Sequence, residues 1–148
     1  MVKVPPPIWA VGFVLIAAAA SYVGGWPRVP GLLLVPVAIV LIAVGIALSA
    51  AAIVLFRRED TEINPTSDVN RKLVTSGPFK LTRNPMYLGL VIVTLGIAFW
   101  VAAWPMFLAP FAMFATANWI HIPFEEAKMR RQFGPAFDNY VHKVRRWI

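Results

Sequence analysis

Four long apolar runs alternate with polar segments along the chain. The runs cover about 8–23, 32–56, 85–102 and 106–121. At 1.5 Å per residue the second run exceeds the ~30 Å hydrocarbon core of a bilayer, so we expect it to tilt or protrude. The pattern predicts an all-α integral membrane protein of about four transmembrane helices. We expect residues 1–148 to form a single domain, with a polar loop over 57–84 and a polar tail over 122–148.

The distribution of charge along the chain predicts its orientation. The formal net charge is +7, yet only 14% of residues are charged and 59% are hydrophobic. With four spans, thirteen of the fourteen Lys and Arg residues share one side with both termini, and only Arg28 lies on the other. Basic residues near span ends mark the cytoplasmic side. We therefore expect a bacterial inner-membrane protein with both termini cytoplasmic, and no nucleic-acid partner.

The composition also excludes or weakens several classes of function. The chain has no cysteine, which excludes thiolate metal sites and cysteine nucleophiles, and we predict no metal site. The glycine patterns of dinucleotide-binding and P-loop folds are missing from the sequence. No ionisable residue lies within the first three apolar runs, which weakens a transporter interpretation. We interpret the first run as a retained helix rather than a cleaved signal.

The loop before the third run carries the sequence TSGPFKLTRNPMYLG, residues 75–89. Gly77-Pro78 predicts a turn. Asn84 suits a helix N-cap, and Pro85 suits the first helical turn. Helix capping alone accounts for this Asn-Pro pair, and Tyr87 is also compatible with a place in the interfacial aromatic belt. A binding role for the loop stays one of two interpretations.

The tail begins with the sequence HIPFEEAKMRRQFGP, residues 121–135. Pro123 can start a new helix as the fourth run ends. Glu125 and Glu126 then fall in a first turn, where the helix dipole favours acids. Glu126 and Arg130 stand four residues apart and are expected to pair.

Five apolar or aromatic side chains recur at three- to four-residue spacing beyond this point: Phe133, Phe137, Tyr140, Val144 and Trp147. The spacing predicts an amphipathic face lying along the lipid headgroups, with basic residues toward anionic lipid.

Taken together, the loop, the apolar hairpin, the Glu pair before "FG" and the aromatic "Y…VRRW" ending resemble a known superfamily. It contains the isoprenylcysteine carboxyl methyltransferases and the phospholipid methyltransferases, which are integral membrane enzymes that use S-adenosylmethionine. The resemblance covers roughly Phe56 to Trp147. It implies methyl transfer to a lipid-like or small hydrophobic acceptor at the cytoplasmic surface of the membrane.

The resemblance implies a set of cofactor-binding residues: Arg71, Lys72, Leu73, Val74, Phe79, Asn84, Pro85, Met86, Tyr87 and Glu125. In this interpretation Leu73, Val74 and Phe79 enclose the adenosine of S-adenosyl-L-methionine. The start of the third helix receives the methionyl carboxylate, and Glu125 binds the ammonium group.

Two further residues are candidates for catalysis, His121 and Glu126, either of which could help to deprotonate the acceptor. His121 stands where the prenylcysteine enzymes carry an Arg that contacts substrate, and Asn84 and Arg71 stand where they often carry His. The loss of that Arg removes a permanent carboxylate partner and argues against a prenylcysteine substrate.

Two alternatives stay open at this point. A non-catalytic membrane scaffold or partner subunit would keep a degenerate cofactor site, and a small transporter would need a polar path through the spans. The sequence leaves open whether the acceptor is an amine, a thiol or a carboxylate.

Overall fold

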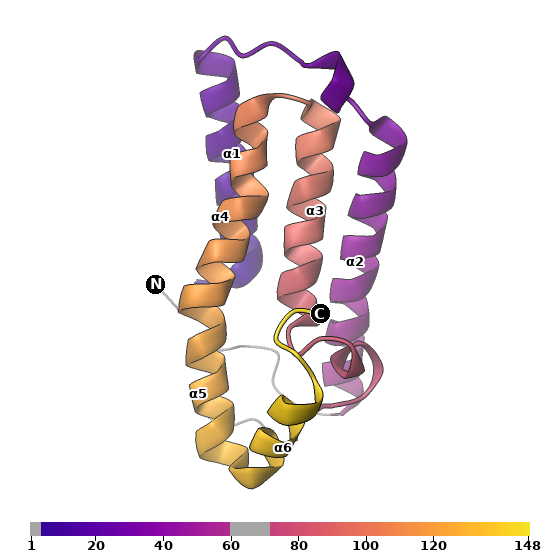
Figure 1. The fold of residues 1–148 in the computed structure, drawn as a ribbon, viewed down its shortest axis with the longest axis vertical. Helices are drawn as coiled ribbons and strands as arrows, with labels where there is room; N and C mark the ends of the chain where they lie inside the picture. Colours follow the sequence, from indigo (N-terminus) through magenta and orange to yellow (C-terminus); the bar gives the residue numbers. More distant parts are fainter. Residues whose placement is uncertain (1–3, 60–71) are drawn as a thin grey trace.

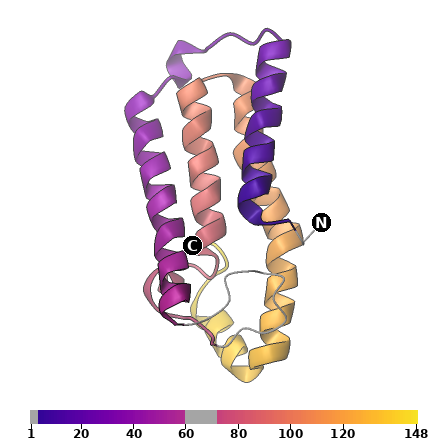
Figure 2. The same cartoon turned by 180° about the vertical axis from the view of Figure 1, so that it is seen from behind.

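The computed structural model describes residues 4–59 and 72–148, and these fold into a bundle of upright helices with a compact polar base (Figure 1). The described residues contain helices and turns but no strand. Figures 1 and 2 show α1 and α4 running side by side, with α3 between them and α2. The start of α1, the end of α2 and the start of α3 lie at the end of the bundle that carries α5 and α6.

The first two helices begin with proline in the first turn. They are α1, Pro6–Val23, and α2, Val35–Arg58, joined through the short 3-10 turn η1, Pro30–Leu32. Proline suits these positions because its missing N–H has no partner within the helix there. The second helix starts later than the predicted position 32 because η1 occupies those residues. It ends later than predicted, at Arg58, because its last-turn arginines complement the helix dipole.

The next two helices form a tight hairpin. The short turn η2, Gly77–Lys80, leads to α3, Pro85–Val101, and a second turn η3, Trp104–Phe107, leads to α4, Leu108–Thr116. The predicted turn at Gly77-Pro78 is confirmed, with Gly77 in the left-handed region at φ 56°.

Pro123 lies in the first turn of a new helical segment, as predicted, but no break separates that segment from the fourth apolar run. A π-helical turn, Ala117–His121, joins α4 to α5, Ile122–Phe133, without a break. The Ile122 N–H donates to the Ala117 carbonyl five residues back. Pro123 would clash with a carbonyl in a regular α-helix, and the wider turn accommodates it. The continuous helix, Trp104–Phe133, spans 30 residues or about 45 Å.

Within the described residues, three helices are long and apolar enough to cross a membrane: Pro6–Val23, Pro30–Arg58 and Trp104–Phe133. The fourth, α3, is apolar but shorter, at 17 residues or about 26 Å. Because the third candidate is longer than the ~30 Å core and its charged residues begin at Glu125, α5 projects beyond the hydrocarbon region. The predicted fold class, an all-α integral membrane protein, is confirmed.

Glycine allows α2 and α3 to approach closely. A Cβ atom on Gly45 would lie 2.5 Å from the carbonyl oxygen of Gly89, and one on Gly96 would lie 2.8 Å from Ile42. Small residues at such contacts let helix backbones pack together in a membrane. This packing fixes the end of α2 against the start of α3, which matters for the site described below.

The final helix, α6, Pro135–Lys143, folds back under the bundle. Phe137 and Tyr140 are buried in one cluster with Phe79 and Val74. The prediction that this apolar face lies along the headgroups is therefore wrong for these residues. Phe137 and Tyr140 do share one face of α6, but that face packs against protein rather than lipid.

Candidate functional site

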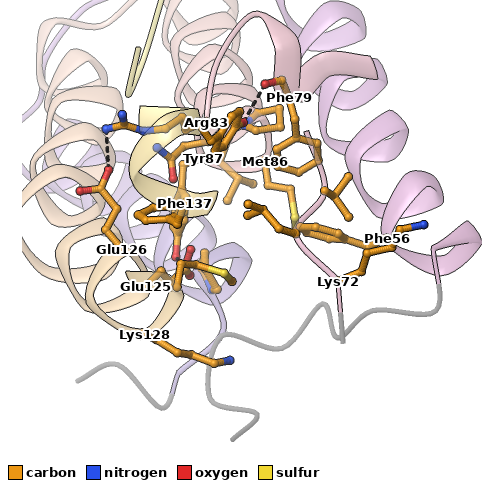
Figure 3. A pocket seen from close by; sticks show the side chains of 18 of the residues that line it. Phe56, Lys72, Phe79, Arg83, Met86, Tyr87, Glu125, Glu126, Lys128 and Phe137 are labelled. Carbon is orange, nitrogen blue, oxygen red and sulfur yellow. Dashed lines mark hydrogen bonds and ion pairs between the residues drawn. The ribbon is translucent and has the colours of Figure 1, made fainter. Parts of the chain in front are cut away.

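A pocket opens at the polar end of the bundle, where five segments meet. Its walls come from the first residues of α1, the end of α2, the segment from Lys72 to the start of α3, and helices α5 and α6. Figure 3 shows the side chains that line it. The empty space, counted out to where it opens to solvent, amounts to about 1020 Å³. Clefts of this kind at the meeting point of several elements are the usual places for small ligands.

Most of the predicted site residues come together in this pocket. Ten of them line it: Lys72, Leu73, Val74, Phe79, Asn84, Pro85, Met86, Tyr87, Glu125 and Glu126. Arg71 lies outside the described residues. His121 does not line the pocket.

One wall of the pocket is apolar and aromatic. Val74 and Phe79 are buried there, and the Phe79 ring lies 5.0 Å from the ring of Phe56 on α2. The Tyr140 hydroxyl donates a hydrogen bond of 2.7 Å to the Phe79 carbonyl, which ties α6 to the η2 turn. An apolar wall with aromatic side chains of this kind suits an aromatic ring system such as a purine.

The opposite wall presents a carboxylate. The hydroxyl of Tyr87, on the first turn of α3, donates a 2.6 Å hydrogen bond to Glu125 Oε1 on α5. Desolvation raises the pKa of Glu125 to about 7; the Tyr87 hydrogen bond and the charge of Lys128 act in the opposite direction but do not cancel it. A cationic ligand in this site would stabilise the ionised form of such a carboxylate.

Comparison with known proteins identifies the family. The model described as phospholipid methyltransferase matches residues 33–136, well over half of the chain. The chain belongs to the phospholipid methyltransferase family. Family membership implies a membrane methyltransferase, and the superfamily predicted from the sequence is confirmed. No curated protein and no solved structure matches the chain.

The segment matched by the family contains both Glu125 and Tyr87, together with the Asn-Pro pair that opens α3. Asn84 occupies the N-cap position, but its side chain makes no capping hydrogen bond. It donates instead to the backbone carbonyl of Arg146, at 2.9 Å, while its own N–H donates to the Thr82 hydroxyl at 3.1 Å. The expected capping role is therefore wrong, because the Asn84 side chain binds the C-terminal end of the chain.

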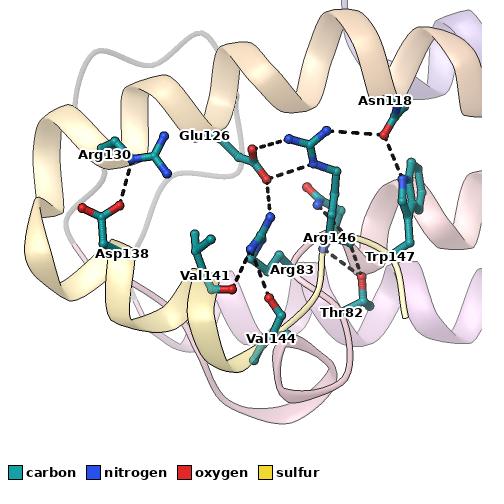
Figure 4. Close-up of polar contacts among 11 residues, drawn as sticks. Thr82, Arg83, Asn118, Glu126, Arg130, Asp138, Val141, Val144, Arg146 and Trp147 are labelled. Carbon is teal, nitrogen blue, oxygen red and sulfur yellow. Dashed lines mark hydrogen bonds and ion pairs between the residues drawn. The ribbon is translucent and has the colours of Figure 1, made fainter.

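Glu126 is held by two arginines rather than by Arg130. Arg83 donates to Glu126 Oε1 at 2.8 Å, and Arg146 donates to both oxygens, at 3.2 and 2.6 Å (Figure 4). Arg130 pairs with Asp138 instead, at 2.8 Å. The predicted Glu126–Arg130 pair is wrong because Arg83 and Arg146 occupy both oxygens of Glu126, and Asp138 binds Arg130.

His121 lies in the core next to the pocket rather than on its wall. It is fully buried, stacked on Tyr87 with ring centroids 5.8 Å apart and edge-on to Trp9 at 6.2 Å. Neither ring nitrogen has a hydrogen-bond partner among the described residues. In this conformation the Tyr87 ring stands beside His121, and the imidazole does not face the pocket.

Sequence reasoning missed several residues that build the pocket. Among them are Phe56, Arg83, Lys128, Phe137 and Tyr140. The three-residue spacing of Phe137 and Tyr140 was recognised, but their partner surface could not be read from the sequence. The position of Arg83 next to the Asn-Pro pair was the one available signal for its role.

Proposed function

We propose that the protein transfers a methyl group from S-adenosyl-L-methionine to a lipid-like acceptor at the membrane surface. The observation that carries this proposal is the Glu125 carboxylate, which lines the pocket of a phospholipid methyltransferase family member with a pKa raised to about 7.

The residues of the pocket fit this cofactor. S-adenosylmethionine has an aromatic ring system at one end and two positive charges, a sulfonium and an ammonium, at the other. The aromatic wall around Phe79 suits the adenine, and the desolvated Glu125 suits the cationic end. The first turn of α3 reaches the pocket through Pro85 and Met86, and its positive dipole favours the methionyl carboxylate.

When bound, S-adenosylmethionine would supply a methyl group on a positively charged sulfur, so that an acceptor lone pair attacking the methyl carbon in line displaces the sulfur as a neutral thioether. The chain has to hold the two reactants in register and exclude water. Such alignment can be worth ~7–11 kcal/mol. Phe137 and Tyr140 on α6 close the base of the pocket, and Tyr87 fixes the direction of the Glu125 carboxylate.

The acceptor is proposed to enter from the bilayer. The pocket reaches Pro6 and Pro7 at the start of α1 and Leu90 on α3, which lie where the helices enter the apolar region. A lipid could thus present its head to the pocket while its chains stay in the membrane. Of the two candidate bases, Glu126 lines the pocket but is paired with two arginines, and His121 stands behind Tyr87. Alignment of acceptor and cofactor is therefore proposed as the main source of the rate enhancement.

We further propose that the pocket faces the cytoplasm. Basic residues concentrate at the end of the bundle that carries it, and such residues mark the cytoplasmic side of bacterial inner membranes.

The test is transfer of labelled methyl from S-adenosylmethionine into a lipid extract by the purified protein. Base-stable label in lipid supports methylation of an amine or thiol, and base-labile label indicates a carboxyl ester. Cofactor binding without any label in lipid would point to a small non-lipid acceptor. The absence of both transfer and binding would contradict the proposal and favour the non-catalytic scaffold.

A further inference from the structure

Residues 144–148 form a strap that follows α6 and returns toward the start of α3 (Figures 1 and 4). The strap lies beyond the segment that the family model matches. None of its residues lines the pocket with Glu125. Its contacts nevertheless reach three residues that do: Arg83, Asn84 and Glu126.

Backbone carbonyls of the strap hold the segment that leads into α3. The Arg83 N–H donates to the Arg145 carbonyl at 3.0 Å. The Arg146 carbonyl accepts from the Thr82 hydroxyl at 3.0 Å and from the Asn84 amide at 2.9 Å. The guanidinium of Arg83 also donates to the Val144 carbonyl at 3.1 Å. The strap thus fixes three consecutive residues, Thr82 to Asn84, which lie directly before α3 and one helical turn before Tyr87.

Two side chains anchor the strap at its other edge. The Arg146 guanidinium grips both oxygens of Glu126 on α5, which is a geometry that arginine matches and lysine does not. The Trp147 Nε1–H donates to the Asn118 side chain in the π-helical turn at 3.0 Å, and its ring lies 4.8 Å from that of Phe114. The strap therefore joins α4, α5 and the start of α3 at one point.

We propose that Arg146 and Trp147 are positioning residues of the cofactor pocket. They set the distance between Tyr87 on α3 and Glu125 on α5, because the strap holds Glu126 next to Glu125 and Asn84 at the start of the helix that carries Tyr87. This inference rests on the proposed function, since it concerns affinity for the cofactor. It extends the functional unit to the C-terminal end of the described chain.

The experiment measures binding of S-adenosylhomocysteine by calorimetry for the full-length protein and its variants. Arg146→Ala is expected to raise the dissociation constant on the order of tenfold, while the number of sites per folded protein stays near one. Arg146→Lys restores part of the affinity, and Trp147→Phe, which keeps the ring but removes the donor, gives a smaller loss. Arg131→Ala, which removes an exposed arginine from α5, serves as the matched control and leaves binding unchanged.

A double-variant cycle tests whether Arg146 acts through Glu126. Arg146→Ala added to Glu126→Gln is expected to cause little further loss, since coupled residues are not additive. A fall in the number of sites with an unchanged dissociation constant would mean that the strap only supports folding, and would overturn the inference. Wild-type affinity in Arg146→Ala would overturn it as well. Failure of the wild-type protein to bind at all would instead contradict the proposed function.

Discussion

Two regions on helix α5 treat neighbouring carboxylates in opposite ways. In the pocket region, Glu125 has a tyrosine hydroxyl as its hydrogen-bond partner and a pKa raised to about 7 by desolvation. In the clamp region, Glu126 is held by two arginines. A carboxylate paired with arginines holds helices together, whereas a desolvated carboxylate with a raised pKa is suited to binding a cationic ligand. Two glutamates that are adjacent in the sequence can therefore have different roles.

Breaking the clamp, the ion pairs of Glu126 with Arg83 and Arg146, is expected to give the largest effect on stability. Glu126→Gln leaves Arg83, a side chain only 10% exposed, without its charged partner. Breaking a buried pair from one side costs about 3 kcal/mol, so the midpoint of thermal unfolding in detergent should fall clearly. An unchanged midpoint would show that the backbone carbonyls of Val141 and Val144 satisfy Arg83 without a charged partner.

Neutralising the pocket carboxylate is expected to change the stability of the protein in the opposite direction. Glu125→Gln should stabilise the free protein by roughly 1–3 kcal/mol at pH 8, because the folded state no longer holds a desolvated charge. The folded pKa, about 7, lies above the ordinary value of 4.5, so this gain is full above pH 7 and disappears as the pH falls toward 4.5. Thermal unfolding at pH 8 and pH 5 checks both points, and destabilisation at pH 8 would place Glu125 with the structural acids.

Cofactor affinity should depend on pH for the same reason. Binding of a cationic ligand requires ionised Glu125, so affinity should weaken by up to about tenfold per pH unit below pH 7. Calorimetry in buffers of different ionisation enthalpy should detect proton uptake by the buffer near pH 7. A flat profile that matches Glu125→Gln would remove Glu125 from the binding step.

The smallest effect is expected at the exposed ion pair between Arg130 and Asp138. Both side chains are about half exposed, and solvent screening leaves such a surface pair little effect on stability. Arg130→Ala should therefore change neither the unfolding midpoint nor cofactor affinity by more than a small amount. A large loss of affinity would show that the turn between α5 and α6 contributes to cofactor binding.

The fold and much of the pocket could be predicted because their signals are local. Apolar runs predict the spans, and the Gly77 turn and the motif around Tyr87 lie within short segments. The partners of Glu126, Asn84 and Phe137 could not be predicted, since each depends on how the tail folds back. The continuous helix through Pro123 was also missed, because a π-helical turn has no distinct sequence pattern.

The central claim is that Glu125 binds the cationic end of the cofactor. The most direct test is calorimetric binding of S-adenosylmethionine at pH 8 to the wild-type protein and to Glu125→Gln. We predict a loss on the order of a hundredfold in the variant, as expected when the charged partner of a cationic ligand is removed, with the fold intact. Equal affinities in the two proteins would contradict it.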